Sequence, residues 1–232
     1  MIKNKKMKLD KRILLCAKTV RPGSRVADIG TDHAYLVIWL VLNNLVSYAI
    51  ACDLREGPLL NAKENIKKYD VQENIETRLS DGLDNINDNE VDDIVIAGMG
   101  GELIINIIKR ADWLKNKEKH LVLQPMSAEQ ELREFLASEG YMIKSEQAVV
   151  SYGKVYTVMS VFYEGNIKIM DKLYPYIGLL KDNLTREAYL YIEKEIRNLN
   201  NKVLGFMATH QVKKAEYLND IISELKSIVR EK

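Results

Sequence analysis

Two carboxylates flank a glycine in one short stretch of the chain, Asp28-Ile29-Gly30-Thr31-Asp32-His33. Glycine lets a ligand approach the backbone closely, and the free amide groups at the start of a helix bind polar ligands. The stretch has only one glycine of the G-x-G-x-x-G phosphate motif, and acids at 28 and 32 would repel a pyrophosphate but attract an ammonium group. The pattern therefore favours a ligand such as the methionine end of S-adenosylmethionine over a dinucleotide.

Further polar and glycine-rich positions follow at the ends of later apolar runs. Asp53 comes 25 residues after Asp28, where an acid typically accepts hydrogen bonds from the ribose hydroxyls of an adenosine. Asp81-Gly82-Leu83 could read the adenine amino group and pack Leu83 on the ring, although an Asp-Gly pair is often only a turn. Ala97-Gly98-Met99-Gly100-Gly101 leaves the backbone bare. That suits either close approach of a flat substrate or a tight turn from strand to helix.

Other reactive side chains are sparse. His33 is the one histidine near these positions, and a single histidine is more often structural than catalytic, although a direct role stays open. Cys16 and Cys52 lack metal-ligand spacing, which predicts buried free thiols in a reducing cytoplasm and no metal site. No run of 18 apolar residues is present, so we expect neither a membrane span nor a signal peptide.

The elements that must hold these residues alternate between strand and helix. Buried strands are predicted at 25–30, 48–53, 75–79, 91–97 and 120–124, and helices at 7–20, 32–43, 56–69, 101–109 and 127–138. Ser127 and Gln130 form a plausible capping box for the last of these helices. The alternation predicts a parallel sheet covered on both faces, and the carboxyl ends of its strands would bring the candidate residues to one edge.

The pattern changes after residue 140. Residues 141–150 and 154–163 are two β-rich runs that predict an antiparallel hairpin, a feature of the class I methyltransferases among doubly wound folds. Two later apolar seams predict an antiparallel helical hairpin joined near residues 208–211. They consist of Ile192, Ile196, Leu199, Val203 and Met207, and of Ala215, Leu218, Ile222, Leu225 and Val229. We expect domains at 1–165 and 166–232, with one domain carrying all helices as the alternative.

The net charge of +1 hides an uneven distribution. Residues 1–25 carry nine basic side chains and one acid, residues 26–165 carry 13 and 23, and residues 166–232 carry 12 and nine. A basic segment can bind a polyanion whatever the total charge, although such a face is ordinarily just solvated. The basic residues of the first segment considered for phosphate binding are Lys5, Lys6, Lys8, Lys11, Arg12, Lys18, Arg21 and Arg25.

In these motifs the chain resembles a known family, the bacterial tRNA (adenine-N1)-methyltransferases of the TrmK type, which modify adenine 22 of tRNA. The matching strings lie at 27–36, 57–59, 80–83, 96–101 and 123–125, together with Asp53 and Ala62. The match covers about residues 8–165, and the tail is similar to the family's C-terminal coiled coil. Val37 departs from the family's usual proline, and Ser151-Tyr152 replaces the usual acidic residues on a substrate-side loop.

The resemblance implies a class I methyltransferase with a Rossmann-like doubly wound sheet that binds S-adenosylmethionine and methylates N1 of adenine 22 in tRNA. The cofactor contacts expected are Asp28, Ile29, Gly30, Thr31, Asp53, Leu54, Asp81, Gly82, Leu83, Ala97, Gly98 and Met99. The substrate contacts expected are Gly100, Gly101, Gln124, Lys8, Lys11 and Arg12. Asp32, and secondly His33, are the candidates for stabilising the charge that develops on the methylated base.

Two other functions remain open at this point. One is a methyltransferase acting on a small molecule or a protein. The other is a non-catalytic sensor of an adenosine cofactor that uses the coiled coil to bind partners. The basic first segment favours a large anionic substrate, so we expect tRNA as the partner, no obligate protein partner and a cytoplasmic location.

Overall fold

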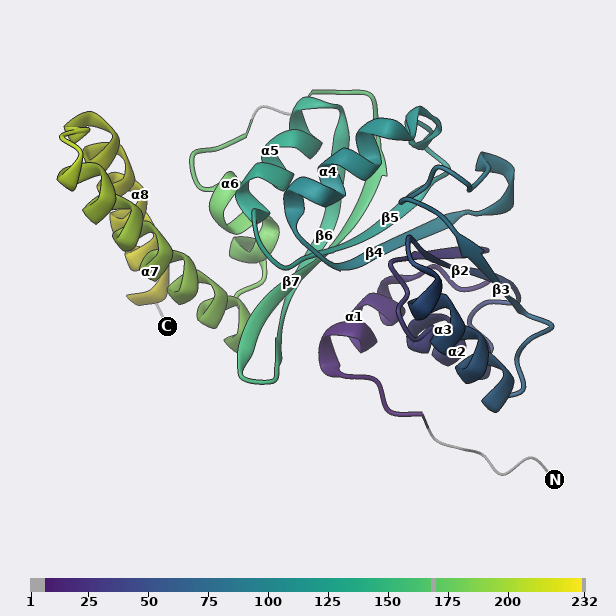
Figure 1. Cartoon of the computed structure of the whole chain (residues 1–232). Helices are drawn as coiled ribbons and strands as arrows, with labels where there is room; N and C mark the ends of the chain where they lie inside the picture. The colour runs from purple at the N-terminus through teal and green to yellow at the C-terminus, as the bar shows by residue number, and fades with distance from the viewer. Residues whose placement is uncertain (1–6, 168–169, 231–232) are drawn as a thin grey trace.

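A seven-stranded mixed sheet forms the centre of the molecule, seen in a computed structural model that describes residues 7–167 and 170–230 (Figure 1). The strand order is β3-β2-β1-β4-β5-β7-β6. The first five strands are parallel to one another, and β7 pairs antiparallel with both β5 and β6. The strands are β1 (Val26–Ile29), β2 (Ala49–Asp53), β3 (Ile75–Leu79), β4 (Asp93–Met99), β5 (His120–Pro125), β6 (Tyr141–Ser151) and β7 (Lys154–Tyr163). The Rossmann-like fold with its antiparallel final hairpin is therefore confirmed.

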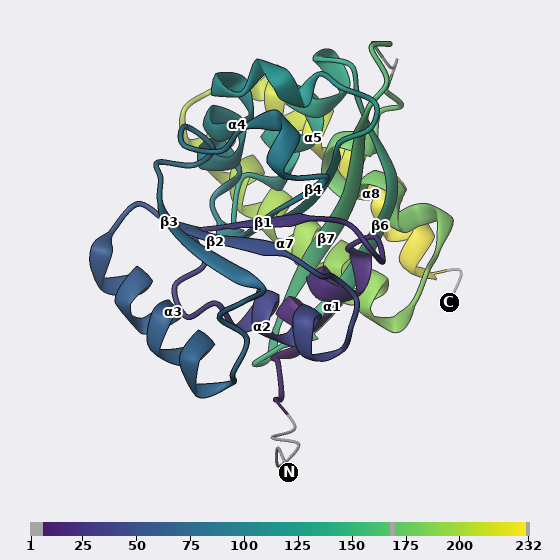
Figure 2. The same ribbon diagram turned by 90° about the vertical axis from the view of Figure 1, so that its right-hand side faces the viewer.

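Helices cover both faces of this sheet and extend beyond it (Figure 2). The α-helices are α1 (Lys11–Thr19), α2 (Tyr35–Leu42), α3 (Glu56–Lys68), α4 (Gly101–Arg110), α5 (Glu129–Ser138), α6 (Tyr174–Ile177), α7 (Arg186–Ala208) and α8 (Val212–Arg230). Short 3-10 turns are η1 (Asp88–Glu90), η2 (Asp112–Leu114) and η3 (Gly178–Asp182). No helix in the described ranges has the length and apolarity needed to cross a bilayer.

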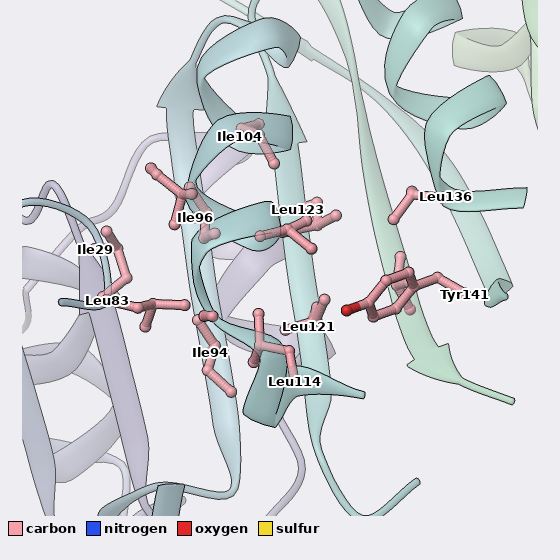
Figure 3. Close-up of a cluster of buried hydrophobic side chains, with 14 of the residues drawn as sticks. Ile29, Leu83, Ile94, Ile96, Ile104, Leu114, Leu121, Leu123, Leu136 and Tyr141 are labelled. Carbon is pink, nitrogen blue, oxygen red and sulfur yellow. The ribbon is translucent and has the colours of Figure 1, made fainter. Parts of the chain in front are cut away.

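Alternate residues of the strands feed two separate cores. Ile29, Ile94 and Ile96 pack under α4 and α5, in the cluster that Figure 3 shows. Val26 and Val95 face the other way, toward α1, α2 and α3. Burial on both faces explains why the central strands read as nearly continuous apolar runs.

Three helix starts differ from the sequence prediction. The helix predicted from residue 7 begins at Lys11, because the Asp10 side chain caps it by accepting hydrogen bonds from the Arg12 and Ile13 amides. The helix predicted from residue 32 begins at Tyr35, because Asp32 and Ala34 both have positive φ and form a turn. The capping box at Ser127 and Gln130 is wrong, since α5 begins at Glu129 after a left-handed Ala128 with no side-chain cap. The Ser127 carbonyl accepts a hydrogen bond from the Gly101 amide at 2.8 Å, so this segment is held against α4 instead.

The helical tail pairs α7 with α8 as expected. Ile192, Leu199, Leu218, Ile222 and Leu225 are buried in its seam. The last predicted position of the first seam is wrong, because Met207 is 52% exposed and the neighbouring Phe206 packs inward. A heptad steps by three after Val203, which selects residue 206.

The base of the tail is attached to the sheet. Leu180, Ala188 and Tyr191 pack against Ala148 and Val155 of the final hairpin. The distal parts of α7 and α8 extend away from the sheet (Figure 1). A domain boundary near residue 165 thus remains a prediction. The first turns of α7 pack against the β6–β7 hairpin, so by their contacts they belong with the sheet domain.

Candidate functional site

The carboxyl ends of β1, β2 and β4 form one edge that carries the predicted glycine and acid residues. In the register of the sheet, Ile29 lies between Cys52 of β2 and Ile96 of β4. Asp28 and Asp53 therefore lie on neighbouring strands at this edge. Ile29 itself is 2% exposed and belongs to the core (Figure 3), so its part in the site is limited to its backbone.

A tight turn at Gly30 forms the floor of this edge. The amides of Gly30 and Thr31 both donate to the Cys52 carbonyl at 2.8 Å, which locks the turn against β2. Gly30 has φ of +74°, and a Cβ there would overlap the terminal methyl group of Met99. Two reasons therefore favour glycine at this position: the backbone has a positive φ, and the Met99 side chain occupies the space that a Cβ would need.

The Asp28 carboxylate is almost completely buried next to this turn. Its Oδ2 accepts a 2.6 Å hydrogen bond from the Thr31 hydroxyl. Burial raises the pKa of Asp28 to about 6, an effect that the Thr31 hydrogen bond opposes and the nearby Asp53 charge reinforces. A cation that binds beside Asp28 would therefore stabilise its ionised form.

Asp53 is 8% exposed, and its Oδ1 accepts a hydrogen bond from the Arg55 amide at 2.9 Å. This bond orients the carboxylate where the chain turns from β2 into α3. The next side chain, Leu54, is 62% exposed at the same edge. An oriented acid beside an exposed apolar group suits a sugar with an attached base.

Asp32 and His33 form an exposed pair at the rim. Asp32 Oδ2 lies 3.3 Å from His33 Nε2, and the two side chains are 62% and 44% exposed. The His33 ring stacks on Tyr35 with centroids 5.3 Å apart, and the His33 backbone carbonyl accepts a hydrogen bond from the side-chain Nδ2 of Asn65 at 3.1 Å. The pair is fixed in position yet open to a ligand.

The stretch after β3 lies at the outer side of the edge. The Asp81 carboxylate receives hydrogen bonds from Arg110 at 2.9 and 3.0 Å, which lower its pKa. A Cβ at Gly82 would meet Ile107 at 2.9 Å. Leu83 is 3% exposed and packs in the core (Figure 3), so little of its side chain could reach a ring. No sequence pattern indicates the pairing of Asp81 with Arg110, since 29 residues separate the two side chains.

The glycines at the end of β4 and at the start of α4 serve two purposes. Gly98 is exposed and has φ of +80°, while Ala97 and Met99 are half-buried, so this backbone is open to a ligand. Gly101 is buried, and a Cβ there would overlap the Ala128 carbonyl. The predicted contact between Gly101 and substrate stays a prediction, and the 127–128 backbone that covers Gly101 argues against it.

Gly100 is only partly covered. A Cβ added there would meet the Ser127 hydroxyl at 3.2 Å. The side of Gly100 that faces this hydroxyl is therefore closed to a substrate.

Gln124 connects this backbone to helix α1. Its side chain is fully buried, and its Oε1 accepts hydrogen bonds from the Gly98 amide at 3.0 Å and from Arg12 Nη1. The predicted contact between Gln124 and substrate stays a prediction; in this structure the buried side chain acts on the site through the Gly98 amide and Arg12. Arg12 also lies over the Tyr156 ring, 5.8 Å from its centroid. Tyr156 was missed from the sequence, where it reads as an ordinary strand residue.

The basic residues of the N-terminal segment are divided between the carboxyl ends and the amino ends of the strands. Lys8, Lys11 and Lys18 are exposed around α1. Arg21 and Arg25 instead pair with Asp93 and Asp92, each at 2.7 Å, at the amino ends of the strands. A part for Arg21 and Arg25 in a phosphate-binding surface stays a prediction, which these ion pairs at the opposite ends of the strands do not favour. Lys5 and Lys6 lie outside the described residues.

Comparison with known sequences finds related proteins for most of this region. A model of the methyltransferase domain family matches residues 9–159. The tRNA (adenine(22)-N(1))-methyltransferase of Bacillus subtilis is 42% identical over 154 residues, which are 66% of this chain and 64% of that protein. The sequence match thus spans slightly less than two thirds of the curated relative. A putative tRNA methyltransferase of Mycoplasma genitalium is 32% identical over 157 residues, 66% of this chain and 69% of that protein.

Comparison with solved structures extends over nearly the whole chain. The crystal structure of the B. subtilis m1A22 tRNA methyltransferase TrmK has a TM-score of 0.84 and 31% identity, covering 96% of this chain and 99% of that one. The Streptococcus pneumoniae protein Sp1610, described as a putative tRNA (m1A22) methyltransferase in complex with S-adenosyl-L-methionine, has a TM-score of 0.83 and 30% identity. That match covers 96% of this chain and 100% of the other. The similarity therefore includes the helical tail as well as the sheet.

Proposed function

Because this chain belongs to the TrmK-type tRNA methyltransferase family, we propose that it transfers a methyl group from S-adenosylmethionine to N1 of adenine 22 in tRNA. The observation that carries the proposal is the pair of buried acids, Asp28 and Asp53, on neighbouring strand ends around the Gly30 turn. The name of the B. subtilis relative supplies the nucleotide.

The residues present fit this cofactor. Asp28 is a buried acid whose pKa is raised by desolvation, and the ammonium group of the methionine part would supply a compensating positive charge beside it. The Gly30 turn leaves the backbone accessible on the side where only the flexible Met99 side chain lies. Asp53 can accept hydrogen bonds from the two ribose hydroxyls, with its orientation set by the Arg55 amide.

The adenine ring would then lie toward Asp81 and the backbone of 81–83. Asp81 is already bonded to Arg110, which fixes the carboxylate and leaves its exposed side for the adenine amino group. Leu54 is the apolar side chain open to the ring at this edge. These assignments make the outer part of the edge the adenosine subsite.

Bound S-adenosylmethionine supplies an electrophilic methyl group on sulfur. The protein must align the N1 lone pair of the target base with it and exclude water. The exposed backbone of Gly98 and Met99 can support the flat base, and Gln124 holds the Gly98 amide in place. Asp32 and His33 lie at the rim, where a carboxylate stabilises the positive charge that the base acquires and Oδ2 can accept the exocyclic N6 proton.

Adenine N1 is on the Watson–Crick edge, so the target base must be unpaired and turned out of its stack. The substrate is then a folded RNA that presents an accessible strand. The exposed cations Lys8 and Lys11 on α1, together with Arg12 at the site, can contact its phosphates. We propose a cytoplasmic location on the same ground, because tRNA is found there.

The test is transfer of a labelled methyl group to unmodified tRNA transcripts. We expect incorporation into a transcript with adenine at position 22 and none when that base is guanine. Asp53→Ala should weaken S-adenosylmethionine binding in calorimetry roughly tenfold or more, since a hydrogen bond to a charged group is lost. Asp70→Asn, an exposed acid away from the edge, is the control.

Methylation that persists after adenine 22 is replaced would refute the nucleotide assignment. Transfer to a protein or small molecule, with none to tRNA, would favour the other methyltransferase reading. Tight cofactor binding with no acceptor at all would favour a sensor.

A further inference from the structure

The β6–β7 hairpin projects past the edge that carries the site. β7 pairs with β5 only as far as Met159 opposite Leu123, so residues 154–158 continue beyond the paired part of β5. At about 3.3 Å per residue, the hairpin tip reaches roughly 17 Å past that pair. Figure 1 shows the tip beside α1. Ser151 Oγ donates to Asp10 Oδ1 at 3.3 Å there. The tip is therefore placed to contact any large substrate that approaches the site.

An exposed aromatic side chain occupies this tip. Tyr152 is 91% exposed and has φ of +48°, followed by Gly153 with φ of +74°. Ser151 pairs with Lys154, so these are the two central residues of a two-residue hairpin loop. Asn or Asp is favoured at the first of two such positions, and a tyrosine is not. Neither the turn nor the packing of the protein explains this ring.

A groove lies between the hairpin and helix α7. It has a volume of about 380 Å³, with Met126, Tyr156 and Leu190 giving it an apolar lining. Its charged lining residues are Lys154, Lys194 and Arg197. Lys194 is neutralised by Glu129 at 2.7 Å. Lys154 and Arg197 are exposed, and neither has a carboxylate partner among the residues that the structure describes. The groove therefore carries two uncompensated positive charges over an apolar surface.

This groove adjoins the candidate site through Met126 and Tyr156. The Met126 amide donates to the Met99 carbonyl at 2.8 Å, and the Met126 sulfur lies 3.7 Å from the Gln124 amide nitrogen. The Tyr156 ring lies under the Arg12 guanidinium group on the side of the site, and Tyr156 and Val155 line the groove. A strand leaving the site past Met126 would run directly between the hairpin and α7.

We propose that this groove binds the RNA strand next to the target adenosine, with phosphates on Lys154 and Arg197 and a neighbouring base stacked on Tyr152. The proposal rests on the proposed tRNA substrate and names the part of the protein that holds it. Positive charge beside aromatic side chains is the pattern by which proteins bind single-stranded nucleic acid. A base turned out of its stack leaves its neighbours available for such stacking.

The hairpin allows an experiment that separates folding from binding. Tyr152→Asn removes the ring but places a favoured residue at the positive φ, so the melting temperature should stay equal or rise. We expect its kcat/KM for an unmodified tRNA transcript to fall roughly tenfold. Tyr152→Phe keeps the ring and should retain most of the activity. Affinity for S-adenosylmethionine, measured by calorimetry, should be unchanged in both.

The cations are tested by Lys154→Glu and Arg197→Glu. Each should raise KM for the transcript and lower the salt dependence of transcript binding by about one phosphate contact. Lys117→Glu is the matched control, because Lys117 is equally exposed but lies beside the start of β5 at the opposite edge. It should leave both values as in the wild type.

The failures of the two proposals are distinguishable. If wild-type protein methylates the transcript but the Tyr152, Lys154 and Arg197 variants behave like the Lys117 control, the groove proposal is overturned, and a protein partner becomes the better occupant. If the wild type itself transfers no methyl group to tRNA, the proposed function fails first, and the groove proposal fails with it.

Discussion

The buried Asp28 carboxylate lowers the folding stability of the protein when no ligand is bound. Asp28 is 5% exposed and has one hydroxyl partner, so ionising it inside the protein is unfavourable. Its pKa of about 6 exceeds the ordinary value of 3.8 in the unfolded chain. Folding therefore favours the protonated form. The penalty is absent at low pH, grows as the pH rises from about 4 to 6, and remains above that.

We expect Asp28→Asn to stabilise the free protein at pH 7.5 by roughly 2–3 kcal/mol and to have little effect near pH 4. Urea unfolding at both pH values measures this difference. Cofactor affinity should show the opposite trend, rising between pH 5 and 7 in the wild type as Asp28 ionises, and losing this rise in the variant. A stability difference that does not change with pH would contradict the role of the Asp28 charge.

Among the elements, the junction between α4 and the loop before α5 fixes the shape of the site. The Gly101 amide donates to the Ser127 carbonyl, and the Gly101 Cα faces the Ser127 and Ala128 backbone. The left-handed Ala128 that follows lets α5 start immediately beyond. In the same junction the Met126 amide donates a hydrogen bond to the Met99 carbonyl. These contacts hold α4, β4 and β5 together as one unit under the site.

Gly101→Ala should destabilise the protein by roughly 1–3 kcal/mol, because its neighbours are backbone atoms that cannot rotate away. Gly57→Ala is the matched control. Gly57 lies in α3 with no atom near a Cβ position, so alanine there should stabilise by about 0.5–1 kcal/mol. Midpoints of urea unfolding compare the two. Equal effects would show that the α4 junction is not tightly packed.

For the whole molecule, one buried ion pair joins the body to the tail. Arg133 of α5 and Glu146 of β6 are both fully buried and lie 2.7 Å apart. Arg133 also donates to the Tyr191 hydroxyl at 3.0 Å and to the Tyr176 carbonyl. Glu146 accepts from the Thr157 hydroxyl at 2.8 Å.

Arg133→Met should cost roughly 3–5 kcal/mol, because it leaves the Glu146 charge buried without its partner. The exposed Arg186→Met at the start of α7 is the control and should change little. Calorimetry should show one unfolding transition in the wild type and an earlier separate loss of the tail in the Arg133 variant. A single unshifted transition in that variant would mean that the pair does not hold the tail.

The sequence determined the fold class, the order of the strands and helices, and the strand-end positions of Asp28, Gly30 and Asp53. These follow from local patterns, since apolar runs mark strands and the residues that follow them must meet at one edge. The heptad seams likewise predicted the helical pair, apart from the step that selects Phe206 over Met207.

Which side chains are open to a ligand depends on contacts between distant parts of the chain. Arg12, Arg21 and Arg25 read alike in the sequence, but Arg12 reaches Gln124 at the site, whereas the other two pair with acids at the far edge. Gly98 and Gly101 also read alike, yet one is exposed and the other is covered by the 127–128 backbone. The partners lie 26 or more residues away along the chain, so no local pattern encodes these contacts.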